Sequence, residues 1–185
     1  AGTPSTVFLG GIASNYQLNF WTSPESRWMV VEADEYDRSF LNLAPWGAII
    51  TATDADHLDI YGNHQELQRS FEQFARSVQG PLIVREGLDF AGSLQYGFSA
   101  HLPYRASNVE VREQAFHFDF HYPGGVLENL SCGIPGRYNV ENSLAAAAMA
   151  LQSGIEPGDI RGALETFTGV QRRFEYHLRG KNQVY

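Results

Sequence analysis

The stretch from Trp46 to Tyr61 places the strongest constraint on how this chain can fold. It begins with a short apolar run, Ala48-Ile49-Ile50, whose β-branched residues predict a buried strand. The run ends in a polar segment, residues 51–59, that carries three carboxylates and one imidazole. Because ligands of open α/β sheets bind beyond the carboxyl ends of the strands, this segment predicts a ligand site.

A second stretch has the same form. The apolar run Trp28–Val31 leads directly into an acidic segment that begins at Glu32. Two such strands could bring Glu32 and His57 to one divalent cation on bound phosphates, since Mg²⁺ takes one or two carboxylates plus phosphate oxygens. An imidazole ligand is less usual for Mg²⁺ but acceptable for Mn²⁺. The alternative is that these residues only end the two strands and bind no metal.

The rest of the first half alternates between strand and helix patterns, which predicts a mainly parallel sheet flanked by helices. Apolar residues at helical spacing follow Asn63, a suitable N-cap. The expected elements are a strand at 6–9 ended by Gly10-Gly11, a polar surface loop at 12–24, strands at 28–32, 46–51 and 82–84, a helical turn at 38–43 and a helix from Asn63 to Val78.

The middle of the chain alternates between apolar and polar residues, which predicts an antiparallel meander at the edge of the domain over residues 96–130. Phe118 and Phe120 would share its apolar face. His117, Asp119 and His121 would share the other face, where their spacing fits a strand-borne metal site. The polar face of a half-buried strand is the favoured interpretation.

The last third returns to helices, over residues 140–152 and 157–167, with Gly154 as the C-cap of the first. The amides of Asn139 and Asn142 could read an adenine edge, because each offers a donor and an acceptor. The alternative for Asn139 is an N-cap. Arg172 and Arg173 could bind phosphate, or could be a solvated pair after the helix.

Charge and composition exclude several classes of protein. The net charge of −8, from 13 basic and 21 acidic residues, argues against general nucleic-acid binding. No apolar run approaches the roughly 20 residues that span a bilayer, and no leader pattern is visible. The single cysteine, Cys132, fits a packing role and a reducing cytoplasm. The length of 185 residues is typical of one domain.

Taken together, the motifs resemble those of the Mur ligase family, the ATP-dependent amino-acid ligases of peptidoglycan synthesis. The resemblance extends over nearly the whole chain, and its specificity comes from the joint occurrence of the motifs in the family's order. It implies the central ATP-binding domain of a P-loop-type α/β fold, with a mainly parallel sheet flanked by helices and a small antiparallel sheet. The segments that carry it are FLGGIASNYQLN, VVEADEYDRSF, ITATDADHLDIYG, GRYNVENSLAAAA and FTGVQRRFEY.

The resemblance also implies a reaction. ATP would phosphorylate the carboxyl group of UDP-N-acetylmuramate, and the amine of L-alanine would attack the acyl phosphate in the bacterial cytoplasm. A related family member that recycles murein tripeptide shares the E-A-D-E-Y-D segment and is the second candidate. A non-catalytic domain on the same scaffold is the third.

The resemblance assigns roles residue by residue. Glu32 matches the family's Mg²⁺ ligand near the γ-phosphate, and His57 matches the ligand of a second metal. Asn139 and Asn142 match the amides that face adenine, whereas Arg173 matches the arginine near the nucleotide phosphates and Arg172 lies beside it. The segment next to the sugar-lactyl end of the substrate matches residues 10–19, including Gly10, Gly11, Asn15 and Asn19.

The family's phosphate loop, A-G-T-H-G-K-T-T, does not occur in these 185 residues, nor does any G-x-x-x-x-G-K-[ST]. The domains that hold the uridine diphosphate and close over ATP have no counterpart here either. We therefore expect residues 1–185 to be a fragment of a longer ligase that has no ligase activity by itself and binds ATP only weakly. The sequence does not indicate an oligomeric state.

Overall fold

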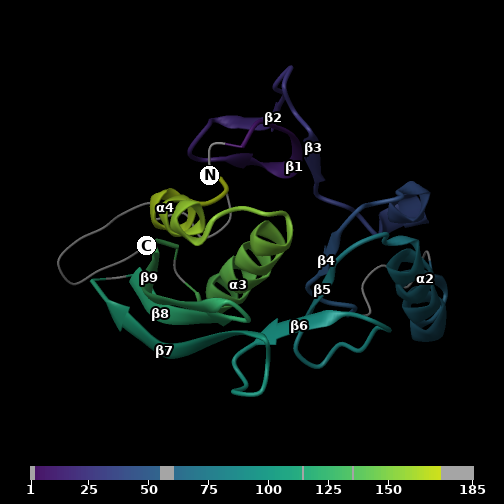
Figure 1. Cartoon of the computed structure of the whole chain (residues 1–185). Helices are drawn as coiled ribbons and strands as arrows, with labels where there is room; N and C mark the ends of the chain where they lie inside the picture. The colour runs from purple at the N-terminus through teal and green to yellow at the C-terminus, as the bar shows by residue number, and fades with distance from the viewer. Residues whose placement is uncertain (1–2, 55–60, 114, 135, 172–185) are drawn as a thin grey trace.

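The computed structural model describes residues 3–54, 61–113, 115–134 and 136–171 (Figure 1). Their strands form a three-stranded sheet of order β2-β1-β3 and a six-stranded sheet of order β4-β5-β6-β7-β8-β9. The elements are β1 (Ser5–Ala13), β2 (Leu18–Trp21), β3 (Trp28–Val31), the 3-10 helix η1 (Tyr36–Asn42), β4 (Ala48–Ile50), α2 (His64–Ser77), β5 (Leu82–Arg85), β6 (Leu94–Gly97), β7 (Tyr104–Arg112), β8 (Ala115–Tyr122), β9 (Gly125–Cys132), α3 (Arg137–Gln152) and α4 (Pro157–Thr166).

The six-stranded sheet confirms the predicted α/β class. Strands β4 to β7 pair in parallel, and β7, β8 and β9 continue the sheet as an antiparallel meander at its edge. The prediction was wrong for the first strand of the meander. That strand ends at Gly97, and it pairs in parallel with both β5 and β7.

Helices cover both faces of this sheet, as the alternation of side chains along β5 shows. Leu82 and Val84 pack in one apolar cluster with Phe74 of α2, whereas Ile83 packs in another with Leu144 of α3. Figure 1 shows α3 crossing the sheet with α4 beside β9, and α2 at the β4–β5 end.

The core confirms several sequence predictions. Phe118 and Phe120 are buried beneath α3, whose Ala147 and Ala148 approach the sheet closely, and Cys132 is buried in the same cluster. The Asn63 side chain caps α2 by accepting a hydrogen bond from the Glu66 N–H at 3.0 Å. Leu67 and Phe74 form the buried face of that helix.

The three-stranded sheet corrects two predictions. Strand β1 continues through Gly10 and Gly11 to Ala13, and the predicted surface loop at 12–24 contains β2. Glycine is a weak strand former, so local propensity predicts a break at Gly10-Gly11. Tertiary packing overrides that preference, because the bare backbone of Gly11 lets Val170 pack directly against it.

The start of α3 corrects a third prediction, the alternative role of Asn139 as an N-cap. Gly136 occupies the N-cap position with φ +101°, and Asn139 lies in the first helical turn, where its N–H donates to the Gly136 carbonyl at 3.0 Å. Gly154 follows the C-cap of α3 at φ +80°, close to its predicted place.

In the part of the chain that the structure describes, no helix combines the length and the apolar character needed to cross a membrane.

Candidate functional site

Glu32 follows directly after β3, and its position is fixed by β1. Its N–H donates to the Phe8 carbonyl at 3.0 Å, which extends the parallel pairing of the two strands by one bond. Its carboxylate oxygen Oε2 accepts the N–H of Gly10 at 2.7 Å. A Cβ at position 10 would lie 3.1 Å from that oxygen, so the glycine makes room for the Glu32 carboxylate. Gly10 and Glu32, predicted separately, therefore form one unit.

Residues that follow Glu32 contact Tyr61, the last residue of the segment 46–61, in which His57 also occurs. Tyr61 donates its hydroxyl hydrogen to the Glu35 carbonyl at 2.5 Å, and the Arg38 guanidinium lies 5.0 Å from the Tyr61 ring centre. Burial raises the pKa of Tyr61, and the positive charge of Arg38 acts in the opposite direction. His57 itself lies outside the described residues, so its pairing with Glu32 stays a prediction.

Asn15 joins the N-terminal sheet to the segment after α4. Its amide nitrogen donates to the Thr166 carbonyl at 2.7 Å, and its amide oxygen accepts from the N–H and the hydroxyl of Thr168 at 2.8 and 2.9 Å. The Gln171 N–H donates to the carbonyl of Ile12 at 2.8 Å, which continues this attachment along β1. The Asn15 side chain, which we predicted to contact substrate, is therefore hydrogen-bonded to Thr166 and Thr168. Asn19, in contrast, is exposed in β2.

The attached segment ends at Gln171, the last described residue. Arg172 and Arg173 come next in the sequence and lie outside the described residues. Their predicted role at the nucleotide phosphates stays a prediction.

The first turns of α3 lie at the carboxyl ends of β5 and β6. The Arg137 guanidinium lies 4.0 Å from the centre of the Phe98 ring, directly after β6. Glu141 forms a 4.0 Å ion pair with Arg85, the last residue of β5. Asn139 and Asn142 are thereby placed where an open α/β sheet binds ligands; Asn142 is exposed and Asn139 is partly buried.

Sequence reasoning missed Glu86, which organises the turn after β6. Its carboxylate accepts the N–H groups of Phe98 and Ser99 at 3.1 and 3.3 Å and the hydroxyl of Ser99. These hydrogen bonds hold the pKa of Glu86 below its ordinary value, and the bond from the Ser99 hydroxyl has the largest effect. No local pattern marks Glu86, because its partners lie 12 and 13 residues further on. Arg137 belongs to the GRYN segment, but the sequence alone did not indicate its contact with Phe98 and therefore suggested no role for it.

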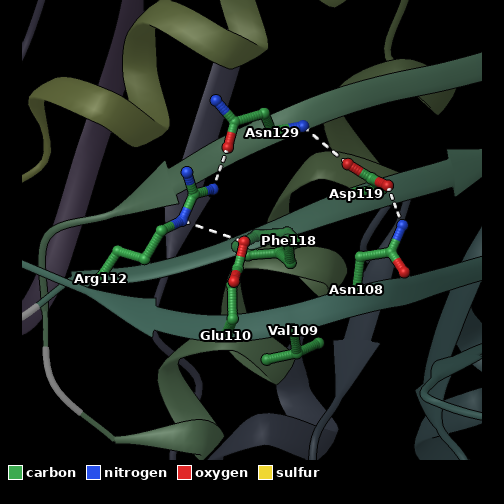
Figure 2. A pocket seen from close by; sticks show the side chains of 7 residues that line it. All are labelled: Asn108, Val109, Glu110, Arg112, Phe118, Asp119 and Asn129. Carbon is green, nitrogen blue, oxygen red and sulfur yellow. Dashed lines mark hydrogen bonds and ion pairs between the residues drawn. The ribbon is translucent and has the colours of Figure 1, made fainter.

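On the polar face of β8, the side chains of Asp119 and His121 form hydrogen bonds within the sheet, as expected for the polar face of a half-buried strand. His121 contacts Ser107 at 2.7 Å, and the carboxylate of Asp119 accepts from the Asn108 amide at 2.6 Å and from the Asn129 N–H at 2.7 Å. Figure 2 shows these Asp119 bonds among the side chains that line an open pocket. The volume of that pocket is about 500 Å³. Among the described residues, no three His, Cys, Asp or Glu side chains are grouped as metal ligands.

Comparison with known proteins identifies the family. The sequence profile of the Mur ligase middle domain matches residues 12–150. The chain belongs to the Mur ligase family.

Two curated relatives are similar to nearly the whole chain. The UDP-N-acetylmuramate–L-alanine ligase of Phocaeicola vulgatus is 39% identical over 187 residues, which cover 97% of this chain and 41% of the relative. The enzyme of that name from Christiangramia forsetii is 42% identical over 185 residues, which cover 99% and 40%. The chain thus spans about two fifths of the length of these curated relatives.

Solved structures agree in fold. The crystal structure of the UDP-N-acetylmuramate–alanine ligase of Thermotoga maritima superposes with a TM-score of 0.83 at 27% identity, covering 97% of this chain and 42% of that chain. The UDP-N-acetylmuramate:L-alanyl-γ-D-glutamyl-meso-diaminopimelate ligase of Neisseria meningitides gives 0.77 at 23% identity, covering 92% and 60%. The second likeness supports the fold alone.

Proposed function

We propose that this chain is the central, ATP-binding part of an enzyme that joins L-alanine to UDP-N-acetylmuramate in the cytoplasm. The observation that carries the proposal is the similarity of nearly the whole chain to ligases of that name. The Glu32 carboxylate at the carboxyl end of β3, oriented by the Gly10 N–H, gives the proposal its chemistry.

The described residues fit a magnesium–nucleotide site. Glu32 is exposed and offers a carboxylate, the oxygen donor that Mg²⁺ prefers alongside phosphate oxygens. In the proposal, Glu32 and His57 would hold Mg²⁺ ions, and Mn²⁺ ions could replace them. A cation held by these residues would supply positive charge to the transferring phosphoryl group.

The remaining residues bind and orient the reactants. Asn139 and Asn142 donate and accept hydrogen bonds at the adenine edge. Arg173, with Arg172 beside it, binds nucleotide phosphates through charge-assisted hydrogen bonds. The segment that contains Gly10, Gly11, Asn15 and Asn19 lies next to the muramate. Within it, the bonds of Asn15 to Thr166 and Thr168 support a role in holding the site together.

The proposed reaction has two steps. The carboxylate oxygen of UDP-N-acetylmuramate attacks the γ-phosphorus of ATP, and ADP leaves. The neutral amine of L-alanine then attacks the acyl carbon, and the tetrahedral intermediate expels phosphate as the amide forms. Aligned cationic and hydrogen-bonding groups stabilise the charge that develops in both steps.

The decisive test uses the full-length enzyme and measures ADP release that depends on both substrates. Because single electrostatic groups at a reacting centre contribute about 10²–10³ in kcat, we expect losses of that order in Glu32→Ala and His57→Ala. Arg76→Ala, on the exposed surface of α2, is the control and should keep normal turnover. Near-normal turnover in both site variants would favour a non-catalytic domain.

The fragment interpretation has its own test. Without phosphate-loop amides and the phosphate-loop lysine, residues 1–185 should bind Mg-ATP more weakly than micromolar and should not catalyse ligation. Isothermal titration of Mg-ATP into the isolated chain measures this, and a micromolar dissociation constant would contradict it.

A second candidate is a ligase that recycles murein tripeptide, which the E-A-D-E-Y-D segment supports. Offering L-alanine and the tripeptide as competing amine acceptors to the full-length enzyme separates the two. Preference for the tripeptide would replace the first candidate.

A further inference from the structure

We propose that Arg137, held over the Phe98 ring, is a positioning residue that sets Asn139 and Asn142 against the nucleotide base. The inference rests on the proposed function, because it extends the nucleotide site by residues that do not touch the nucleotide. It follows from how the first turns of α3 are fixed in space.

The start of α3 has little local support. Gly136 is at the N-cap, and in the described part of the chain no side-chain hydrogen bond caps the helix. Helix starts leave several N–H groups without intrahelical partners, and a Ser, Thr, Asp or Asn cap normally stabilises them. Contacts from other elements must therefore fix the direction in which this helix begins.

Besides the buried Val140, two such contacts attach the start of the helix to the sheet. Arg137 packs on Phe98 at the end of β6, and Glu141 pairs with Arg85 at the end of β5. The two helical residues are four apart, so they lie on one face of α3. The ion pair is long, and its arginine side chain is 46% exposed, so it contributes little. The Arg137–Phe98 contact is the stronger restraint.

The backbone that carries the Phe98 ring is itself held by hydrogen bonds. Glu86 binds the N–H groups of Phe98 and Ser99 and the hydroxyl of Ser99, which fixes the backbone of the turn. A Cβ at Gly97 would collide with the Glu86 carboxylate, so the turn is built around that carboxylate. The restraint thus runs from Glu86 through Phe98 to Arg137.

The geometry of α3 directs the two asparagines away from this attachment. With 3.6 residues per turn, Asn139 and Asn142 are three apart and share a face that differs from the face of Arg137 and Glu141. Hydrogen-bond recognition of a base edge requires placement within about 0.5 Å. A helix start that is free to rotate would misplace both amides and leave the phosphoryl-transfer residues in place.

The test uses the full-length enzyme and compares Arg137→Met, Arg137→Lys and Phe98→Leu. Arg137→Met and Phe98→Leu should raise KM for ATP roughly three- to tenfold, the range expected for a lost cation–π contact, with kcat within about twofold. The preference for ATP over GTP should fall by a similar factor. Arg137→Lys keeps a cation over the ring and should restore most of the wild-type KM.

Arg161→Met is the matched control, because it makes the same substitution on α4, where Arg161 pairs with Glu165 at 3.4 Å. It should change neither KM nor the preference for ATP. An unchanged KM in Arg137→Met, or equal weakening of ATP and GTP with no rescue by lysine, would overturn the inference. A wild-type enzyme without ATP-dependent turnover would contradict the proposed function as well, so the two failures are distinguishable.

Discussion

The close approach of Val170 to Gly11 allows a quantitative test of how β1 is joined to the segment after α4. A Cβ at Gly11 would lie 2.5 Å from Val170 Cγ1. The usual carbon–carbon contact is about 3.5–4.0 Å, so Gly11→Ala must push the two segments apart by about 1 Å or more. Overpacking of this kind costs about 1–3 kcal/mol of unfolding free energy.

Removing the colliding methyl group should relieve the strain. Val170 Cβ would lie 4.0 Å from the new Cβ, an ordinary contact, so Val170→Ala makes room for a methyl group at position 11. Val170 is half-buried, and we expect Val170→Ala alone to cost about 1 kcal/mol. The double variant should then be about as stable as Val170→Ala, with a coupling free energy of about 1–3 kcal/mol.

Urea unfolding of the wild type, both single variants and the double variant, followed by circular dichroism, measures this cycle. Gly158→Ala is the control, because no described atom lies within 4 Å of a Cβ built at that position in α4. It should be neutral or stabilising by up to about 1 kcal/mol. A Gly11→Ala protein as stable as the wild type, or strictly additive losses in the double variant, would refute the packing argument.

Two further predictions concern acid stability and exposed apolar surface. The Asn129 N–H, and then the Asn108 amide, hold the pKa of Asp119 below its ordinary value. The stabilisation is therefore complete above the unfolded carboxyl pKa of about 3.9 and is lost as the pH falls through the lower folded value, so Asp119→Asn should flatten the decline of the urea midpoint below about pH 4. The ring centres of Phe8 and Phe20 lie 4.6 Å apart in a tilted arrangement, and each residue is 44% exposed. Replacing both with Ser should reduce the binding of an apolar fluorescent dye to the isolated chain, and unchanged fluorescence would show that their face is covered.

Much of the fold could be predicted because its signals are local. The strand at 82–84, the Asn63 cap and the apolar face of α2 each depend on residues within one or two turns or one strand. The alternation that buries Phe118 and Phe120 is equally local. Helical and strand periods act over such distances, so these elements were found with nearly correct bounds.

The candidate site was only partly predictable. Glu32 and Gly10 were found separately, but the hydrogen bond that joins them depends on the parallel pairing of β1 with β3. The role of Asn15 depends on residues more than 150 positions away. Glu86 was missed because its partners belong to a different strand end.

The sequence by itself determined the family, the helices and most strands. Periodicity, helix caps and turn residues reflect interactions between residues that are close together in the chain. Only the tertiary structure decided that β1 runs on through Gly10-Gly11, that β6 pairs in parallel with β7, and that Arg137 rests on Phe98. Each of these choices is made by partners far away in the chain. Their packing and hydrogen-bond energies exceed the local preferences that a sequence pattern records.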